Sequence, residues 1–167
     1  YKDNIETLKR HTGKQLKGML GPALSGSEIT PDLMADAGLI YHTDWMHDDQ
    51  PVPIKVRSGK LISVPYSVET NDGMVLRNFC DGNYFEKICK AQFDQLYKEG
   101  AVSGRVMCLA IHPFLSGQPH RVKHLDRILE YIMSHDGVWQ TSADEIAEYY
   151  IANYYDDAVA HAARINR

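Results

Sequence analysis

The chain has 167 residues, a net charge of -4 and a hydrophobic share of 44%, and its pI is about 6.0. This length fits one domain over residues 1–167 with a sizeable core, and the mildly acidic balance argues against a nucleic-acid partner. No apolar run approaches the roughly 20 residues that cross a bilayer, and no secretory leader is recognisable. We therefore expect no membrane partner and a cytoplasmic location.

Helices and strands are predicted to alternate along the chain. Helical patterns cover residues 3–10, 30–37, 83–100 and 119–135, and another helix starts from a cap at 141–145. Strand patterns cover residues 17–20, 39–43, 52–56, 61–66, 106–111 and 137–140. This alternation predicts an α/β fold with a largely parallel sheet. The sheet has too few strands for a closed (β/α) barrel, so it is open, or it belongs to a barrel that is incomplete or completed from outside the chain.

The start of the chain and its cysteines give two further expectations. Tyr1 is not a methionine and the pattern over 3–10 already reads as the middle of a helix, so we expect the chain to start inside a larger domain. The chain has an odd number of cysteines without CxxC spacing, namely Cys80, Cys89 and Cys108. Reduced thiols are therefore expected in place of a disulfide framework or a zinc knuckle.

An apolar run over 106–111 ends on His112 and Pro113. Such a run is typical of a strand buried on both faces of a parallel sheet, and the carboxyl ends of those strands carry the chemistry of many α/β enzymes. Proline cannot extend the sheet ladder, so the ring of His112 is expected to face a cleft. The alternative is a histidine that is simply hydrogen-bonded in the core.

Two other segments concentrate polar side chains after predicted strands. Residues 41–51 contain three carboxylates and two imidazoles within a few positions, a density that shifts pKa values and can orient a catalytic histidine. The alternative is a solvated acidic loop. The segment 64–72 ends in Glu69, Asn71 and Asp72, which either reach the same edge of the sheet or form an Asx-rich turn.

His120 and His124 have the i, i+4 spacing that places two imidazoles on one helix face. They lie on the expected solvent side of the helix over 119–135, whose inward positions are Val122, Leu125, Ile128, Leu129 and Ile132. A surface pair is therefore expected rather than a metal site. The chain contains no phosphate-binding glycine loop and no Gly-x-Ser-x-Gly elbow.

Five segments taken together resemble the polysaccharide-deacetylase (NodB-homology) superfamily. They are 17–22 (KGMLGP), 44–51 (DWMHDDQP), 64–72 (VPYSVETND), 111–113 (IHP) and 137–139 (GVW). The resemblance runs over nearly the whole chain, matches the C-terminal portion of these proteins, and is most similar to the branch of metal-independent allantoinases. It implies part of a distorted (β/α) barrel that lacks its N-terminal strands.

The resemblance also implies an activity, the hydrolysis of a C–N bond in a small-molecule amide or cyclic amide. His112 would be the general acid, because a histidine is suited to protonate a departing nitrogen. Asp44 and Asp48 would support it as further catalytic residues. The implied substrate-binding residues are Trp45, Asp49, Tyr66, Glu69, Asn71 and Pro113.

The chain also departs from the family pattern. The early acidic motif and the His-x-x-x-His pair that hold the metal of the deacetylases do not precede Lys17, and the arginine expected near 17–22 is missing. No cofactor is thus expected in this chain. Zinc or another divalent metal is expected only if those motifs are present. A homo-oligomer or a second chain completing the barrel is expected. The alternative function is a non-catalytic, truncated domain that binds a small molecule or a partner chain.

Overall fold

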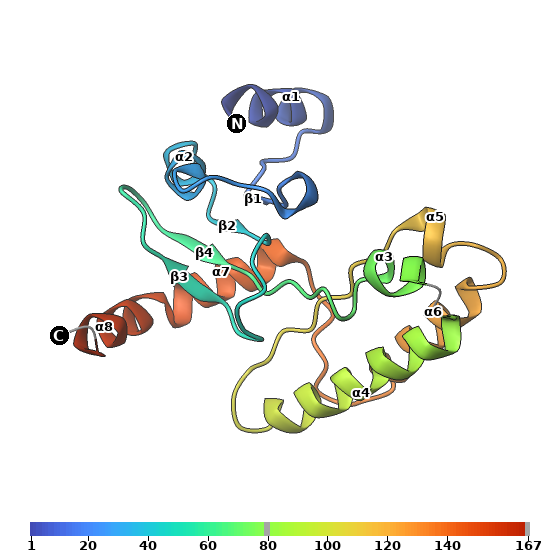
Figure 1. The fold of residues 1–167 in the computed structure, drawn as a ribbon. Coiled ribbons are helices and arrows are strands. Elements are labelled where there is room, and N and C mark those ends of the chain that lie inside the picture. Colours follow the sequence, from blue (N-terminus) through green and yellow to red (C-terminus); the bar gives the residue numbers. More distant parts are fainter. Residues whose placement is uncertain (79–80, 166–167) are drawn as a thin grey trace. The chain divides into compact units, whose positions relative to one another are not determined.

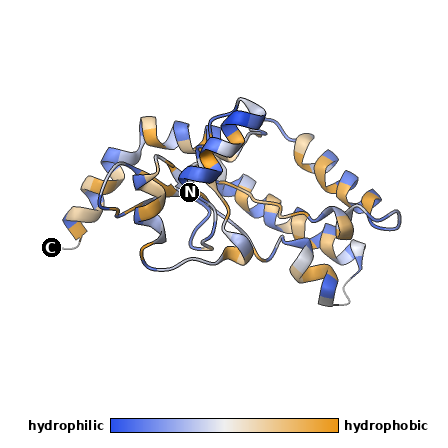
Figure 2. Ribbon diagram, turned by 90° about the horizontal axis from the view of Figure 1, so that it is seen from above, coloured by the Kyte–Doolittle hydropathy of each residue, from blue (hydrophilic) through white to orange (hydrophobic). Residues whose placement is uncertain are grey.

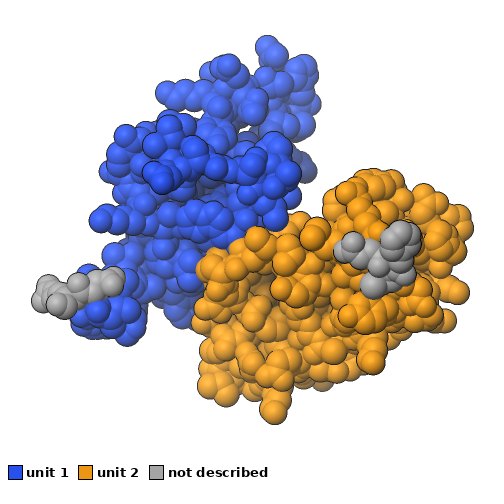
Figure 3. All heavy atoms as spheres, viewed as in Figure 1, with its two compact units in different colours: residues 1–45, 51–64, 141–167 blue, residues 46–50, 65–140 orange. Residues whose placement is uncertain are grey.

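The computed structural model describes residues 1–78 and 81–165, which group into two compact units (Figure 3). Unit 1 comprises residues 1–45, 51–64 and 141–167, and unit 2 comprises residues 46–50 and 65–140. The single domain expected over residues 1–167 stays a prediction. Cys89 and Cys108 are free thiols, as expected, and Cys80 lies outside the described residues.

Unit 1 is a four-stranded sheet with helices (Figure 1). Its elements are α1 (Lys2–Thr12), β1 (Gly18–Met19), η1 (Pro22–Leu24), α2 (Thr30–Asp36), β2 (Tyr41–His42), β3 (Val52–Ile54), β4 (Leu61–Ser63), α7 (Ala143–Asn153) and α8 (Tyr155–Ile165). The strand order is β1-β2-β4-β3, with β1, β2 and β4 parallel and β3 antiparallel to β4. The sequence predicted each of these strands, and each is shorter than expected.

The central strand β4 explains how this sheet is covered. Successive side chains of a strand point to opposite faces, and the adjacent residues Leu61 and Ile62 are both fully buried. Leu61 packs with Met34 of α2, whereas Ile62 packs with Ala147 of α7 and Tyr155 of α8. Helices therefore cover both faces of β4, as expected for an α/β sheet.

Local signals fix the ends of several unit 1 elements. Gly13 follows α1 with φ 71°, the left-handed conformation that commonly ends a helix. The predicted turn between β3 and β4 contains Gly59 at φ 69°. The Ser142 hydroxyl accepts the Glu145 N–H, and the Glu145 side chain accepts from the backbone of Ser142, which is the capping box predicted for α7.

Unit 2 is mainly helical. Its elements are α3 (Asp72–Val75), η2 (Leu76–Asn78), α4 (Gly82–Gly100), α5 (Pro113–Ser116) and α6 (Val122–Met133). Figure 2 shows hydrophobic and hydrophilic residues alternating along the helices. The predicted apolar stripe of α4 supplies Phe85, Cys89 and Phe93 to the core, and Ile128 of α6 packs in the same core. Within residues 1–78 and 81–165, no helix is long and apolar enough to cross a membrane.

Two predicted strands are wrong. The run over 106–111 is half-buried and forms a single parallel bridge, between Ala110 and Asn71. Its other backbone bonds are scattered, since the Val106 N–H donates to the Asp49 carbonyl, so no continuous ladder forms. Residues 137–140 form no strand either, and Gly137 has φ 78°, outside the extended region. An apolar pattern alone does not determine which backbone groups find partners.

The predicted faces of α6 are wrong in part, since Ile128 is buried and Leu125 and Ile132 are half-buried as expected. His124, expected at the surface, is 6% exposed, whereas Val122 and Leu129 are 39% and 45% exposed. The His124 Nδ1 lies 2.9 Å from Glu86 Oε2 on α4, and this carboxylate satisfies a buried imidazole. A Cβ at position 82 would lie 2.1 Å from the His124 ring, so Gly82 makes the room. His120 is exposed and precedes α6, so the two histidines do not form a surface pair.

Candidate functional site

The candidate site in unit 2 is built around the bridge between residues 70–72 and the segment that precedes His112. The Ala110 N–H donates to the Thr70 carbonyl at 3.2 Å, and the Asp72 N–H donates to the Ala110 carbonyl at 3.0 Å. The buried Thr70 hydroxyl also donates to the Cys108 carbonyl at 2.6 Å. These bonds fix Asp72 beside His112, 40 positions later in the sequence.

His112 and Asp72 form a close pair with unequal exposure. The His112 Nδ1 lies 2.6 Å from Asp72 Oδ1, and the His112 backbone N–H donates to Asp72 Oδ2 at 2.9 Å. The Asp72 side chain is fully buried, whereas the His112 side chain is 41% exposed. With Nδ1 facing a carboxylate, the proton belongs on that nitrogen, and Nε2 is left for a substrate. Pro113 opens the short helix α5 directly after this histidine.

Hydrogen bonds stabilise the ionised form of Asp72. Burial acts to raise the pKa of the Asp72 carboxyl, but bonds from the Ser116 hydroxyl, the His112 backbone and the His112 ring lower it more, so the pKa lies below its ordinary value. The buried carboxylate therefore stays charged. It can support a positive charge on the imidazole of His112, as an acid–base histidine requires.

Asn71, Gly73 and Tyr66 complete the surroundings of His112. Asn71 caps the N-terminus of α3, where its Oδ1 accepts the Gly73 N–H at 2.8 Å. Its Nδ2 donates to the Tyr66 hydroxyl at 3.0 Å. Burial raises the pKa of Tyr66, so this phenol remains neutral. A Cβ at position 73 would lie 3.0 Å from the His112 Cε1, so the imidazole occupies its place because residue 73 is glycine.

The predicted acidic residues Asp48, Asp49 and Glu69 lie together in unit 2. The Asp49 N–H donates to the exposed Asp48 carboxylate at 2.6 Å, and Glu69 accepts from Ser67 at 3.1 Å. Burial raises the pKa of Asp49. The nearby charges of Asp48 and Glu69 raise it further, and the charge of Arg105 lowers it. These three carboxylates thus form a group around Asp49.

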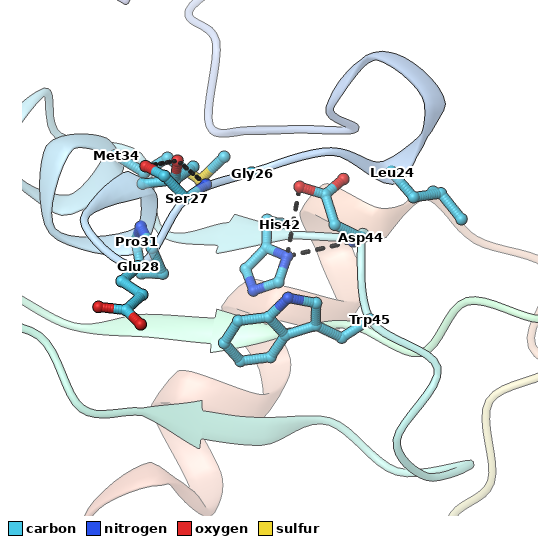
Figure 4. Close-up of a pocket in the computed structure, with 10 residues that line it drawn as sticks. Leu24, Gly26, Ser27, Glu28, Pro31, Met34, His42, Asp44 and Trp45 are labelled. Carbon is cyan, nitrogen blue, oxygen red and sulfur yellow. Dashed lines mark hydrogen bonds and ion pairs between the residues drawn. The ribbon is translucent and has the colours of Figure 1, made fainter.

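Asp44 and Trp45 lie in unit 1, next to the buried His42 (Figure 4). The Asp44 Oδ1 accepts the Gly21 N–H at 2.6 Å. His42 Nδ1 accepts the Asp44 N–H at 3.1 Å and lies 3.8 Å from Asp44 Oδ2. The Trp45 indole meets the His42 ring nearly at right angles, with ring centres 4.6 Å apart. These three side chains line a cavity of about 270 Å³.

The sequence does not indicate the bonds that join His112, Asp72 and Ser116. Asp72 stands among several polar residues after a strand, which either reach the edge of the sheet or form an Asx-rich turn. Ser116 carries no signal at all, because a serine in a Gly/Pro loop is ordinary. The pairing of Asn71 with Ala110, which brings them together, has no signature in the sequence.

The described residues do not supply a metal centre. Within residues 1–78 and 81–165, no group of three or more His, Cys, Asp or Glu side chains is arranged to hold an ion. The residues present therefore do not fit the metal site that the resemblance implies for the deacetylases. No step of the chemistry below is assigned to a metal.

No protein-family model matches the chain, but two curated proteins are similar to it. A provisionally named polysaccharide deacetylase of Schizosaccharomyces pombe is 30% identical in an alignment 146 residues long, which covers 79% of this chain and 46% of that protein. A peptidoglycan deacetylase of Helicobacter pylori is 27% identical in an alignment 179 residues long, which covers 87% of this chain and 60% of that protein. The chain thus spans about half the length of these relatives.

Solved structures agree with this similarity. The Puue allantoinase matches with a TM-score of 0.81 and 30% identity, over 91% of this chain and 51% of that one. A provisionally named polysaccharide deacetylase of Pseudomonas aeruginosa matches with a TM-score of 0.80 and 29% identity, over 91% of this chain and 52% of that one.

The fold is therefore that of part of a NodB-type deacetylase barrel, as the sequence predicted. The chain belongs to the polysaccharide-deacetylase (NodB-homology) superfamily.

Proposed function

We propose that the chain belongs to an enzyme that hydrolyses a C–N bond of an amide or cyclic amide, with His112 as the general acid. The observation that carries this proposal is the half-exposed His112 ring held at 2.6 Å by the fully buried carboxylate of Asp72. The names of the relatives, deacetylases and an allantoinase, support the class of reaction.

The proposed step concerns one proton. Attack of water on the amide carbon forms a C–O bond while the water releases a proton to the solvent, and the C–N bond then breaks only if the departing nitrogen gains a proton. His112 donates that proton from Nε2, while its Nδ1–H stays bonded to Asp72. The negative charge of Asp72 stabilises the imidazolium from which this proton is given.

Other predicted residues are assigned to substrate contacts or to support. The indole of Trp45 is 44% exposed beside the cavity of unit 1, so we propose it as a substrate contact there. Tyr66, Asn71, Pro113, Asp49 and Glu69 are proposed as substrate contacts in unit 2, and Asp48 keeps its predicted part as catalytic support. Asp44 is proposed as support, because its Oδ1 already binds Gly21.

The proposal is tested with His112→Ala in the full-length natural protein. Release of acetate from N-acetylglucosamine oligomers and ring opening of allantoin are measured separately, because the relatives include both kinds of name. We expect kcat on the accepted substrate to fall by roughly 10²- to 10⁴-fold, with little change in thermal stability because the ring is half-exposed. His120→Ala, at an exposed histidine outside the site, is the matched control. Retained turnover in His112→Ala would remove His112 from the mechanism.

A partner for the sheet forms part of the same proposal. β1 stands at one end of the strand order, with β2 as its neighbour, and an open strand edge favours pairing with another strand. We propose that a second copy or a second chain pairs there. Light scattering of the purified protein checks this, because a monomer without a second polypeptide contradicts it.

A further inference from the structure

We propose that Ser116 is a positioning residue that sets the proton affinity of His112 through Asp72. The inference rests on the proposed role of His112 as a general acid. The Ser116 hydroxyl donates to Asp72 Oδ2 at 2.6 Å, and the Ser116 backbone N–H lies 3.3 Å from the same oxygen. The residue is 2% exposed and the carboxylate is fully buried, so water does not compete for this bond.

The two oxygens of Asp72 have different partners. Oδ2 accepts from the Ser116 hydroxyl, the Ser116 N–H and the His112 N–H, while Oδ1 faces the His112 ring. The His112 N–H holds the carboxylate at 2.9 Å whichever side chain stands at position 116, and the Ser116 N–H, which also donates to the His112 carbonyl at 3.1 Å, adds to this placement. The hydroxyl therefore has an electrostatic effect besides placement. The positive end of its dipole points at Oδ2 of the carboxylate whose other oxygen, Oδ1, faces the His112 ring.

Ser116 itself is not the nucleophile. Its hydroxyl hydrogen is committed to Asp72, and the imidazole contacts Oδ1 of that aspartate. A serine nucleophile needs a base within hydrogen-bond reach and access to the substrate. A residue that is 2% exposed has no such access.

The sign of the effect follows from electrostatics. A donor bonded to Oδ2 draws carboxylate charge away from Oδ1 and places positive potential near the imidazole, and both changes disfavour the imidazolium. Among the described residues, the other ionisable groups near the pair of His112 and Asp72 are Tyr66, whose pKa is raised in part by Asp72, and Arg77. The Arg77 guanidinium lies 5.6 Å from the centre of the Phe114 ring, which itself lies 5.4 Å from the His112 ring. None of them changes when residue 116 is substituted.

The test is an NMR titration of His112 that needs no enzymatic activity. Imidazole signals are followed against pH in the ¹⁵N-histidine-labelled full chain, and the His112 signal is assigned by its loss in His112→Gln. Ser116→Ala is expected to move the His112 titration midpoint upward by about 0.3 to 1 pH unit. Ser116→Thr, which keeps the hydroxyl, is expected to restore it.

The control is Ser67→Ala, which removes another buried serine hydroxyl of unit 2, one that donates to Glu69 and accepts the Thr70 N–H but does not contact Asp72. It is expected to leave the His112 midpoint unchanged. If Ser116→Ala does not fold, Ser116→Cys, a weaker donor of similar size, is expected to move the midpoint in the same direction.

A midpoint that stays within 0.1 pH unit, or that moves downward, would overturn the assignment of Ser116. Such a result would leave the proposed function standing, because turnover in His112→Ala tests that function separately. In the active full-length protein, Ser116→Ala should move the His112 limb of the pH–kcat profile upward with KM nearly unchanged, which a merely structural role would not do.

Discussion

Two histidine–aspartate contacts in this chain look alike in composition and differ in geometry. In unit 1, His42 and Asp44 are two positions apart and both are buried, and their side-chain atoms approach only to 3.8 Å. In unit 2, Asp72 and His112 are 40 positions apart, and their side-chain atoms lie 2.6 Å apart. The close pair has a half-exposed histidine, whereas His42 is 2% exposed.

The difference lies in what each carboxylate is used for. The Asp44 Oδ1 binds the Gly21 N–H and so fastens a loop, and His42 Nδ1 accepts a backbone N–H, which is a role of a neutral ring. Asp72 instead presents one oxygen to the ring of His112 and keeps the other on fixed donors. A carboxylate next to a histidine in sequence is thus a poorer guide to acid–base chemistry than one held opposite it by the fold.

The largest expected effect separates these two aspartates. Asp72→Ala removes the acceptor of several buried donors at once, so we expect a loss of about 2 to 3 kcal/mol in the free energy of unfolding. Turnover should fall at least as far as in His112→Ala. Asp44→Ala removes one bond to Gly21 and should cost about 1 to 2 kcal/mol. Urea unfolding of both variants measures the difference.

Asp72→Asn sharpens this comparison, because it keeps the size of the side chain and removes the charge. It should recover part of the stability but not the turnover, since a neutral amide does not stabilise an imidazolium. Equal turnover in Asp72→Asn and the unmodified protein would contradict the role given to Asp72.

A smaller effect is expected at Gly73. Its added Cβ in Gly73→Ala would lie 3.0 Å from His112 Cε1 and 2.9 Å from Asn71 Oδ1, so the imidazole has to shift. Crowding of this kind costs about 1 to 2 kcal/mol, and kcat should fall by more than the stability loss suggests because the ring moves away from Asp72. Gly100→Ala is the control, because a Cβ there meets nothing within 4 Å. Unaltered kcat in Gly73→Ala would argue against a tightly held ring.

The sequence was sufficient for the fold where local signals are strong. The cap at Ser142, the apolar stripe of α4 and the turn at Gly59 each follow from nearby residues, and the structure contains all of them. The strand predicted over 106–111 does not form, because a strand also needs a partner strand and in this run only Ala110 forms a bridge. The predicted exposure of His124 is wrong because its burial depends on Glu86, which lies on another helix.

The site was predictable only in part for the same reason. His112 stood out because an apolar run stops at a histidine followed by proline. The chemistry proposed for His112 rests on Asp72 and Ser116, and their proximity comes from long-range contacts that single-sequence patterns do not report. A candidate catalytic residue is thus easier to recognise in a sequence than the residues that hold it in place.

The smallest expected effect is the acid dependence of the Asp72 pair. The folded-state pKa of Asp72 lies below its ordinary value of 3.8, so as the pH falls the unfolded chain takes up this proton before the folded one does. The contribution of Asp72 to stability is therefore full above about pH 4 and is lost as the pH falls through the folded-state pKa. Urea unfolding at several pH values between 5.5 and 3 should show the stability gap between the unmodified protein and Asp72→Asn narrowing toward acid. A gap that stays constant over this range would mean that the hydrogen bonds to Asp72 do not favour its ionised form.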